Sequence, residues 1–426
     1  MTLAVHDFDR LEASTMLRVP MRLARPGMVL AFAIKHPARR EQVLLRAGFT
    51  LDAPAVARLR ELNIPDLWIQ YPDLEFIGRY INPEIMQGQD ELVRTVGDMF
   101  TTLSLNAHAK LDYPAYRDMI RGFLDKLMQN PNAAVLLSEL GATDKPLLRH
   151  SSNVCYLSLL MGLTLDGYLV QQRSRLPSHR AKDVVNLGVG ALLHDVGMTR
   201  LDREVVERWN ATHDESDEAW QEHVTIGHAM VQGSVEPSAA SVILHHHQRF
   251  DGLGIPRREE ADGEMRGLSG ERIHVYARIV AAADLFDRLR HPPGELGANP
   301  TVRALRLMQE PEMACRIDPM AFRALISVAP PYAPGSLVGL SDGRQAVVKE
   351  WSIEDPCRPT VQIINDLLEG SGGRRREAAP EEINLAAVDH ALFISAAEGS
   401  DVSADNFSPP EPGAFAVPEV DRMEVG

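Results

Sequence analysis

Histidine and aspartate residues gather at the ends of apolar runs in the middle of this sequence. His194 and Asp195 end one such run, and His246 and His247 follow another. Imidazole and carboxylate groups are ligands that divalent transition metals accept in proteins. Because the two pairs lie in similar surroundings, the chemistry that they suggest is that of a metal centre.

Three more residues extend this set: His150, His223 and Asp284, each beside an apolar helical run. Taken singly, each has a simpler explanation, since a lone histidine is usually a surface or hydrogen-bonded core residue and a lone aspartate a helix-surface carboxylate. Burying such groups without partners would cost free energy. A shared metal site explains all seven residues at once.

The composition limits the class of protein. The chain has 426 residues, more than one core usually organises, so two or three domains are expected. Its formal net charge of -15 argues against a general nucleic-acid binder, because neutralising phosphates needs clustered lysine and arginine. A small phosphorylated ligand can still bind in a local basic pocket.

The few cysteines and the apolar windows bear on location. Cys155, Cys315 and Cys357 are scattered and odd in number, which fits neither a disulfide framework nor a zinc-finger spacing. Residues 1–10 carry charge and no continuous apolar stretch, so no signal peptide is expected. The most apolar window, Val154–Val170, is too short and polar for a membrane span. The cytoplasm is the expected location.

The pattern of apolar residues divides the chain into four parts. Strand-like and helical runs favour a small accessory α/β module at 15–80, and apolar steps of three and four residues favour a helical domain at 91–328. Residues 335–395 contain strands around an Asp-Gly hairpin signal and favour a small β module. Residues 398–426 are acidic and poor in large apolar residues, so a disordered tail is expected. The predicted fold is mainly α, with a helical domain flanked by small α/β and β modules.

The region from Leu147 to Pro293 resembles the HD-GYP family, a subset of the HD-domain metal-dependent phosphohydrolases whose members hydrolyse the bacterial second messenger cyclic di-GMP. The motifs that carry the resemblance are Leu193-His194-Asp195-Val196-Gly197, His223 with Gly227, the stretch from His246 to Pro256, Ala283-Asp284-Leu285-Phe286-Asp287, and His150-Ser151. Their order and spacing agree with the family over the whole domain.

The sequence departs from the family pattern at four positions. Met198 replaces a lysine that helps hold a ligand phosphate, Gln248 replaces a glutamate, and Ile255 replaces the tyrosine of the signature tripeptide. Pro146 stands where members with a third metal have a glutamate. The resemblance therefore implies a centre of two metals rather than three.

The resemblance also implies a mechanism and a set of site residues. His150, His194, Asp195 and Asp284 would hold one metal, and His223, His246 and His247 the other, with Asp195 bridging. His194 and Asp195 would be the catalytic pair, and two divalent ions, iron or manganese, would activate water for phosphodiester hydrolysis. The expected substrate-binding residues lie in and after the second histidine pair: Arg249, Asp251, Gly252, Gly254 and Arg257.

Three functions remain open at this point. The first is a cyclic di-GMP phosphodiesterase in bacterial signalling, working alongside protein partners such as diguanylate cyclases. The second is a signalling adaptor that keeps the fold but has lost turnover, which Met198, Gln248 and Ile255 would explain. The third is an HD hydrolase that acts on another nucleotide or phosphoester. The retained ligand set favours the enzyme, because a scaffold without turnover has no need of every metal ligand.

Overall fold

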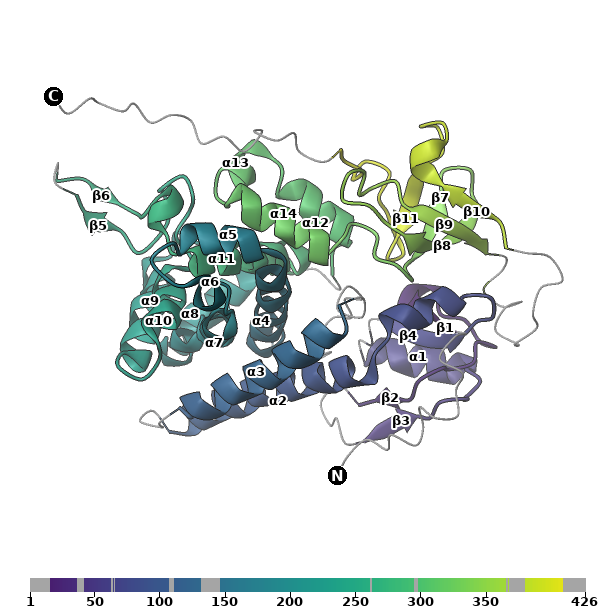
Figure 1. Ribbon diagram of the computed structural model, residues 1–426. Coiled ribbons are helices and arrows are strands. Elements are labelled where there is room, and N and C mark those ends of the chain that lie inside the picture. The colour runs from purple at the N-terminus through teal and green to yellow at the C-terminus, as the bar shows by residue number, and fades with distance from the viewer. Residues whose placement is uncertain are drawn as a thin grey trace.

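The computed structural model describes residues 16–36, 42–62, 64, 66–106, 111–131, 146–260, 263–294, 298–364, 367 and 380–408. Helices fill the middle of the chain, and most strands lie near its two ends (Figure 1). The predicted mainly helical fold with small α/β and β parts is confirmed.

The N-terminal part is a small α/β unit. Its elements are β1 (Met16–Pro20), η2 (Met21–Leu23), β2 (Ile34–Lys35), β3 (Val43–Leu45), α1 (Ala53–Glu61), β4 (Asp66–Gln70) and η3 (Glu75–Tyr80). β1 pairs antiparallel with β4, and β2 pairs with β3. The Asp52 side chain accepts a hydrogen bond from the backbone N–H of Ala55, which satisfies one of the free donors at the start of α1.

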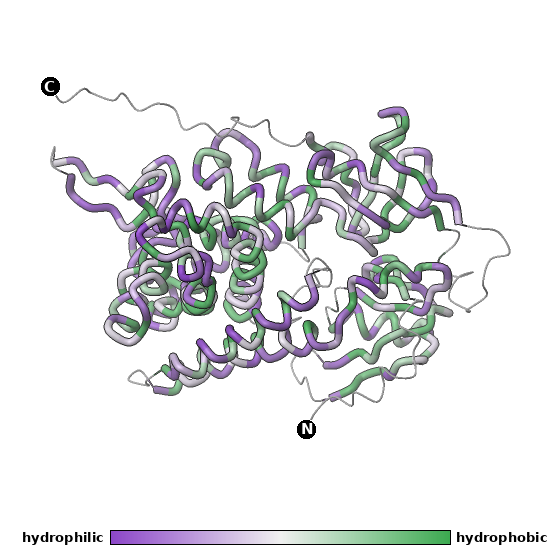
Figure 2. Tube along the Cα trace, in the orientation of Figure 1, coloured by the Kyte–Doolittle hydropathy of each residue, from purple (hydrophilic) through white to green (hydrophobic). Residues whose placement is uncertain are grey.

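A long helical hairpin follows, formed by α2 (Pro83–Leu105) and α3 (Tyr113–Gln129). The two helices lie side by side along one edge of the molecule (Figure 1). Figure 2 shows hydrophilic and hydrophobic residues mixed along both, as expected for amphipathic helices. Their apolar faces, including Leu92, Val96, Ile120 and Phe123, join the core of the helical domain.

The helical domain surrounds α7, whose residues are nearly all buried. α7 packs against α3, α4 and α10. The elements of the domain after the hairpin are α4 (Pro146–Thr164), α5 (Asp166–Gln172), α6 (Ser178–Ala181), α7 (Val185–Leu193), η5 (Val196–Arg200), α8 (Arg203–Thr212), α9 (Glu218–Val231), α10 (Pro237–His245), β5 (Arg258–Glu259), β6 (Met265–Arg266), η6 (Gly270–Arg272), α11 (Val275–Arg290), α12 (Thr301–Leu307), α13 (Pro311–Ala314) and α14 (Pro319–Val328).

The C-terminal part is a six-stranded antiparallel sheet with the order β10-β9-β8-β7-β11-β12. Its elements are β7 (Leu337–Leu340), β8 (Gln345–Glu350), β9 (Thr360–Ile364), β10 (Glu382–Asn384), η7 (Leu385–Ala387), β11 (Ile394–Ala397) and β12 (Ser400–Asp401). The Asp-Gly signal lies in the turn between β7 and β8, where Gly343 has a φ of 88° that favours glycine. Leu337, Val347 and Ile364 of this sheet share a hydrophobic core with the N-terminal unit, so the sheet packs on that unit.

The expectation of a disordered tail from residue 398 is wrong for residues 398–408. Val402 is fully buried, and Asp405 is 5% exposed and accepts hydrogen bonds from Arg303 and Arg306 of α12. Glu398 pairs with Arg290 at the end of α11. These partners lie about a hundred positions earlier in the chain, so local composition could not reveal them. Residues 409–426 lie outside the described part of the chain.

Among the described residues, no single helix is long and apolar enough to cross a membrane. α4 and α5 pass a test of length and composition only as a pair, and they are bent by 87° at the break between them. Most of α4 is buried in the helical core.

Candidate metal centre

His194 and Asp195 lie where α7 ends and η5 begins. His194 is the C-cap of α7 and Asp195 is the N-cap of η5, and both side chains are buried. Neighbours in a regular helix point in different directions, but the change of helix type at this junction turns both side chains toward one centre. The apolar character of α7 fixes the junction deep inside the domain.

Gly197 brings the Asp195 turn against α9. A Cβ atom at position 197 would lie 2.0 Å from the carbonyl oxygen of His223 and 2.7 Å from the backbone nitrogen of Gly227. Only a glycine allows the two backbones to approach so closely. This contact sets the distance of 3.6 Å between Asp195 Oδ1 and His223 Nε2.

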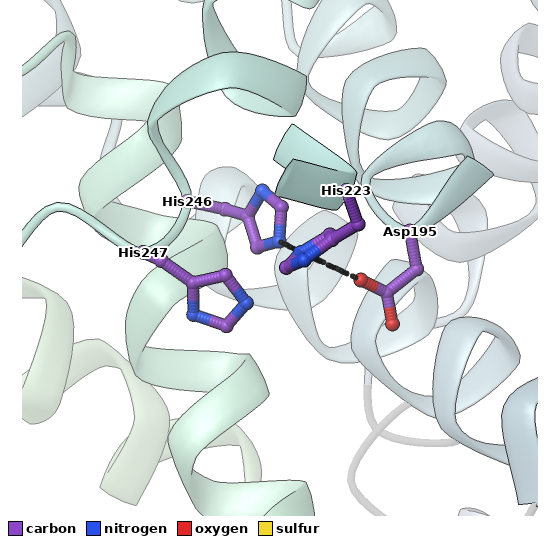
Figure 3. Close-up of side chains that lie close together, drawn as sticks. All are labelled: Asp195, His223, His246 and His247. Carbon is purple, nitrogen blue, oxygen red and sulfur yellow. Dashed lines mark hydrogen bonds and ion pairs between the residues drawn. The ribbon is translucent and has the colours of Figure 1, made fainter. Parts of the chain in front are cut away.

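A first group of possible ligands consists of Asp195, His223, His246 and His247 (Figure 3). One ligand atom from each residue lies within 4.8 Å of those from the others. The Nε2 atoms of His223 and His246 are 3.4 Å apart, and each is 3.6 Å from Asp195 Oδ1. α9 supplies His223, and the end of α10 supplies the histidine pair.

A second group consists of His150 from α4, His194 from α7 and Asp284 from α11. His150 Nε2 lies 3.2 Å from Asp284 Oδ1 and 3.3 Å from His194 Nε2. Asp195 faces this group too, because its Oδ2 is 3.5 Å from His194 Nε2 and 3.7 Å from His150 Nε2. The two oxygens of Asp195 are thus directed to different groups, as a bridging carboxylate requires.

Hydrogen bonds outside the two groups orient the imidazoles. The Nδ1 atoms of His194, His223 and His246 lie 2.8, 2.6 and 3.0 Å from the carbonyl oxygens of Ala191, Trp220 and Ile243. A carbonyl only accepts, so each Nδ1 carries the proton and each Nε2 presents its lone pair to the cluster. The outer partner of a metal-binding histidine acts in this way.

The charges of the buried groups also suit a cation. Burial lowers the pKa of His194 and of His223 to about 4, so both imidazoles are neutral at pH 7. Burial alone would raise the pKa of Asp195, but His194 and the other nearby imidazoles hold it well below its ordinary value. Neutral imidazoles around an ionised carboxylate are the protonation states that bind a divalent metal.

His150 differs from the other imidazoles. Burial would lower its pKa, but hydrogen bonds to Asp284 and Asp287 outweigh burial and raise the pKa of His150 to about 10. Asp287 Oδ2 is 2.7 Å from His150 Nδ1, and Asp287 Oδ1 accepts a hydrogen bond from Asn153. Asp287 is the second aspartate of the motif that contains Asp284, and no separate role for it was predicted from the sequence. The structure shows that it orients His150.

The structure divides the expected substrate-binding residues into two sets. Arg249, Gly254 and Arg257 line a cleft of about 790 Å³ beside His246 and His247, whereas Asp251 and Gly252 do not line it. Asp251 instead accepts hydrogen bonds from Arg249 and from the backbone of Leu253.

Two glycines have different parts in this loop. A Cβ at Gly254 would lie 2.5 Å from the carbonyl oxygen of His247, so glycine is required by close packing. Gly252 has a φ of 85°, which turns the loop. The glycines therefore shape the loop that flanks the cleft.

Three of the four departures from the family pattern, Gln248, Met198 and Ile255, have structural partners. Gln248 is buried, donates to the carbonyl of Pro256 and accepts from the backbone N–H of Leu268, so it fastens the loop. Met198 is buried in a small hydrophobic cluster with Trp220, against which Ile255 packs. None of the three belongs to either ligand group.

Three charged residues at the cleft were not predicted from the sequence: Arg288, Arg316 and Glu215. Arg288 donates to Asp284 Oδ2 at 2.7 Å, and both arginines donate to Glu215. Position 288 is one helical turn after Asp284 on α11, which was the available signal for it.

Comparisons with known proteins agree with this geometry. A family profile described as "HD domain" matches residues 167–321. The cyclic di-GMP phosphodiesterase PA4108 of Pseudomonas aeruginosa is 26% identical, over 82% of this chain and 84% of that protein. The chain therefore contains an HD domain, and over most of its length it is similar to a cyclic di-GMP phosphodiesterase.

Shorter stretches of the chain match other relatives. The cyclic di-GMP phosphodiesterase response regulator RpfG of Xanthomonas campestris is 35% identical over 25% of this chain and 27% of its own length. The 3'3'-cGAMP-specific phosphodiesterase 3 of Vibrio cholerae is 29% identical over 34% of this chain and 29% of its own length. The solved structure of Bd1817, an HDG"Y"P protein from Bdellovibrio bacteriovorus, is 18% identical with a TM-score of 0.43, covering 74% of this chain and 99% of that chain.

Proposed function

We propose that this chain hydrolyses a phosphodiester bond of cyclic di-GMP with two divalent metal ions bound. The observation that carries the proposal is the placement of Asp195, whose two oxygens face two separate groups of ligands. Centres of two ions suit an in-line displacement at phosphorus. The likeness to a cyclic di-GMP phosphodiesterase over most of the chain supports this substrate.

The donor set fits such a centre. His150, His194 and Asp284 would hold one ion, His223, His246 and His247 the other, and Asp195 would be shared. When bound, two such ions lower the pKa of a shared water and stabilise the attacking and leaving oxygens. We propose iron or manganese, because both accept a mixed set of imidazoles and carboxylates.

The cleft beside the histidine pair would hold the nucleotide. Its volume of about 790 Å³ falls within the range usual for small-molecule sites. Arg249 and Arg257 line it, and a guanidinium group can bind either a phosphate or a guanine. Asp251 pairs with Arg249 and so fixes where that guanidinium lies.

The adaptor hypothesis rests on Met198, Gln248 and Ile255. In the structure Gln248 holds the loop through two backbone groups, and Ile255 packs on the cluster that contains Met198. Because all seven candidate ligands lie together in two groups, the enzyme is the better supported function.

The test is hydrolysis by the full chain, purified without oxygen and loaded with iron or manganese. Cyclic di-GMP, 3'3'-cGAMP and a simple aryl phosphodiester are supplied separately, and linear products are quantified. We expect cyclic di-GMP to be the best substrate and Asp195→Asn to abolish turnover. Faster hydrolysis of one of the other two esters would contradict the assignment of cyclic di-GMP as the substrate. If cells that carry D195N keep the full signalling effect of the wild-type protein, the adaptor function without turnover is favoured instead.

A further inference from the structure

Arg288 is placed to act on a ligand beside the metal groups. It lies on α11, one turn after Asp284, and its side chain is 12% exposed. It lines both the large cleft and a smaller cavity of about 70 Å³ that reaches His150 and Asp195. Its guanidinium group lies 5.9 Å from the ring centre of Trp209 and donates to Asp284 Oδ2 at 2.7 Å. The cation is therefore fixed at the boundary between cleft and ligands.

Arg288 and Arg316 hold one carboxylate between them. Arg288 Nη1 donates to Glu215 Oε1 at 2.6 Å, and Arg316 Nη2 donates to the same oxygen at 2.7 Å. Glu215 comes from the short segment between α8 and α9, and all three side chains line the large cleft. Two arginines around one anion form a site that suits a phosphate at least as well, because guanidinium groups bind its oxygens in pairs.

Position 198 lacks the positive charge that the resemblance to the HD-GYP family implies there. Family members have a lysine there that helps hold a ligand phosphate, but Met198 carries no charge and is 5% exposed. Met198 and Arg288 line the same small cavity together with His150 and Asp195. The charge absent at position 198 is therefore available from another wall of the same cavity.

We propose that Arg288 and Arg316 bind a phosphate of the substrate, and that Glu215 occupies their guanidinium groups until the phosphate displaces it. The proposal rests on the proposed function for the identity of the substrate, but not for the existence of the anion site. Glu215 is 33% exposed, so it can move out of the cleft without opening the core. Arg288 keeps a second acceptor, Asp284, which holds its position while Glu215 leaves.

A purely structural part for Arg288 makes different predictions. If it only held Asp284 in position, its removal would weaken metal binding and leave phosphate affinity per metal-loaded chain unchanged. If it binds phosphate, its removal weakens phosphate binding at an unchanged metal content. A Glu215 variant distinguishes these two roles of Arg288 further, because removing the Glu215 carboxylate strengthens phosphate binding only if that carboxylate competes with phosphate.

The experiment measures binding of inorganic phosphate to the metal-loaded full chain by calorimetry, with metal content determined on the same samples. The variants are Arg288→Gln, Arg316→Gln and Glu215→Gln. The control is Arg208→Gln, which removes an arginine paired with Asp217 beside the same segment but outside the cleft. We expect the first two to weaken phosphate binding about ten-fold or more, E215Q to strengthen it several-fold, and R208Q to match the wild type.

Three results would overturn the proposal. They are phosphate affinity in R288Q and R316Q equal to that of R208Q, a loss in R288Q that follows loss of metal, and weaker binding in E215Q. A protein that binds phosphate as expected but does not hydrolyse cyclic di-GMP would leave the anion site standing and refute the proposed substrate. The two failures are thus distinguishable.

Discussion

Replacing Gly197 with alanine tests whether the turn that carries His194 and Asp195 must touch α9 for the metal centre to form. The new Cβ would lie 2.0 Å from the His223 carbonyl oxygen and 2.7 Å from the Gly227 nitrogen, both of them backbone atoms. Carbon atoms in good contact lie about 3.5 Å or more from their neighbours, so η5 and α9 must separate by at least about 1 Å.

That displacement is large compared with the tolerance of a metal site. Asp195 and His223, now 3.6 Å apart, lie on the two segments that would separate. Ligand distances in metal sites hold to within about 0.2 Å, so G197A should lower metal affinity by roughly 100-fold or more. Overpacking a core costs about 1–3 kcal/mol, and a clash between two backbones belongs at the upper end.

The assay is metal content after dialysis against a graded chelator, together with urea unfolding of the metal-free protein. Gly122→Ala is the matched control, because Gly122 lies in α3 and a Cβ there would meet nothing within 4 Å. We expect G122A to keep its metals and to gain about 0.5–1 kcal/mol from helix propensity. A G197A protein that keeps two metals and unfolds like G122A would refute the close-contact argument.

Three further predictions concern the histidines and their partners. Metal binding near pH 7.5 should release about one proton from His150, because its pKa is raised to about 10. Calorimetry of metal binding in buffers of different ionisation enthalpy would detect the proton. Equal binding enthalpies in all buffers would contradict this prediction. Asp287→Asn should weaken metal binding about 10–100-fold, as measured by chelator competition, because the amide orients His150 less well; unchanged affinity would show that the contact is dispensable. Burial and nearby arginines lower the pKa of His274 to about 4, so the unfolded chain binds the extra proton between pH 6.5 and 4 and stability falls as the pH falls through that window. From pH 7 to 5 this should remove roughly 2 kcal/mol of stability, so His274→Asn, which can still cap α11, should lose about that much less than the wild type in urea unfolding.

Helices and turns could be predicted from the sequence where neighbouring residues alone determine them. The apolar run that ends at His194 marks α7, and the Asp-Gly pair marks the turn between β7 and β8. The seven candidate ligands could be named because each stands beside a buried run and in a motif of fixed spacing. Their division into two groups around Asp195 came from the resemblance, and the structure places the same residues together.

Contacts between distant segments could not be predicted. Glu398 finds its partner in Arg290, and Leu337 joins the core of the N-terminal unit, but nothing in the neighbouring residues of either marks the contact. The pairing of β1 with β4 could not be predicted for the same reason, since it spans about fifty positions. Glu215 and Arg316 likewise look like ordinary surface charges until the fold brings them beside Arg288.

We propose that phosphodiester hydrolysis by this chain needs both ligand groups filled. The most direct test is a titration in which the rate of cyclic di-GMP hydrolysis is followed against metal bound per chain, in protein kept free of oxygen. We expect little hydrolysis up to one ion per chain and a steep rise between one and two, because Asp195 connects two sites that work together. Full activity with one ion, or no activity with two, would contradict it.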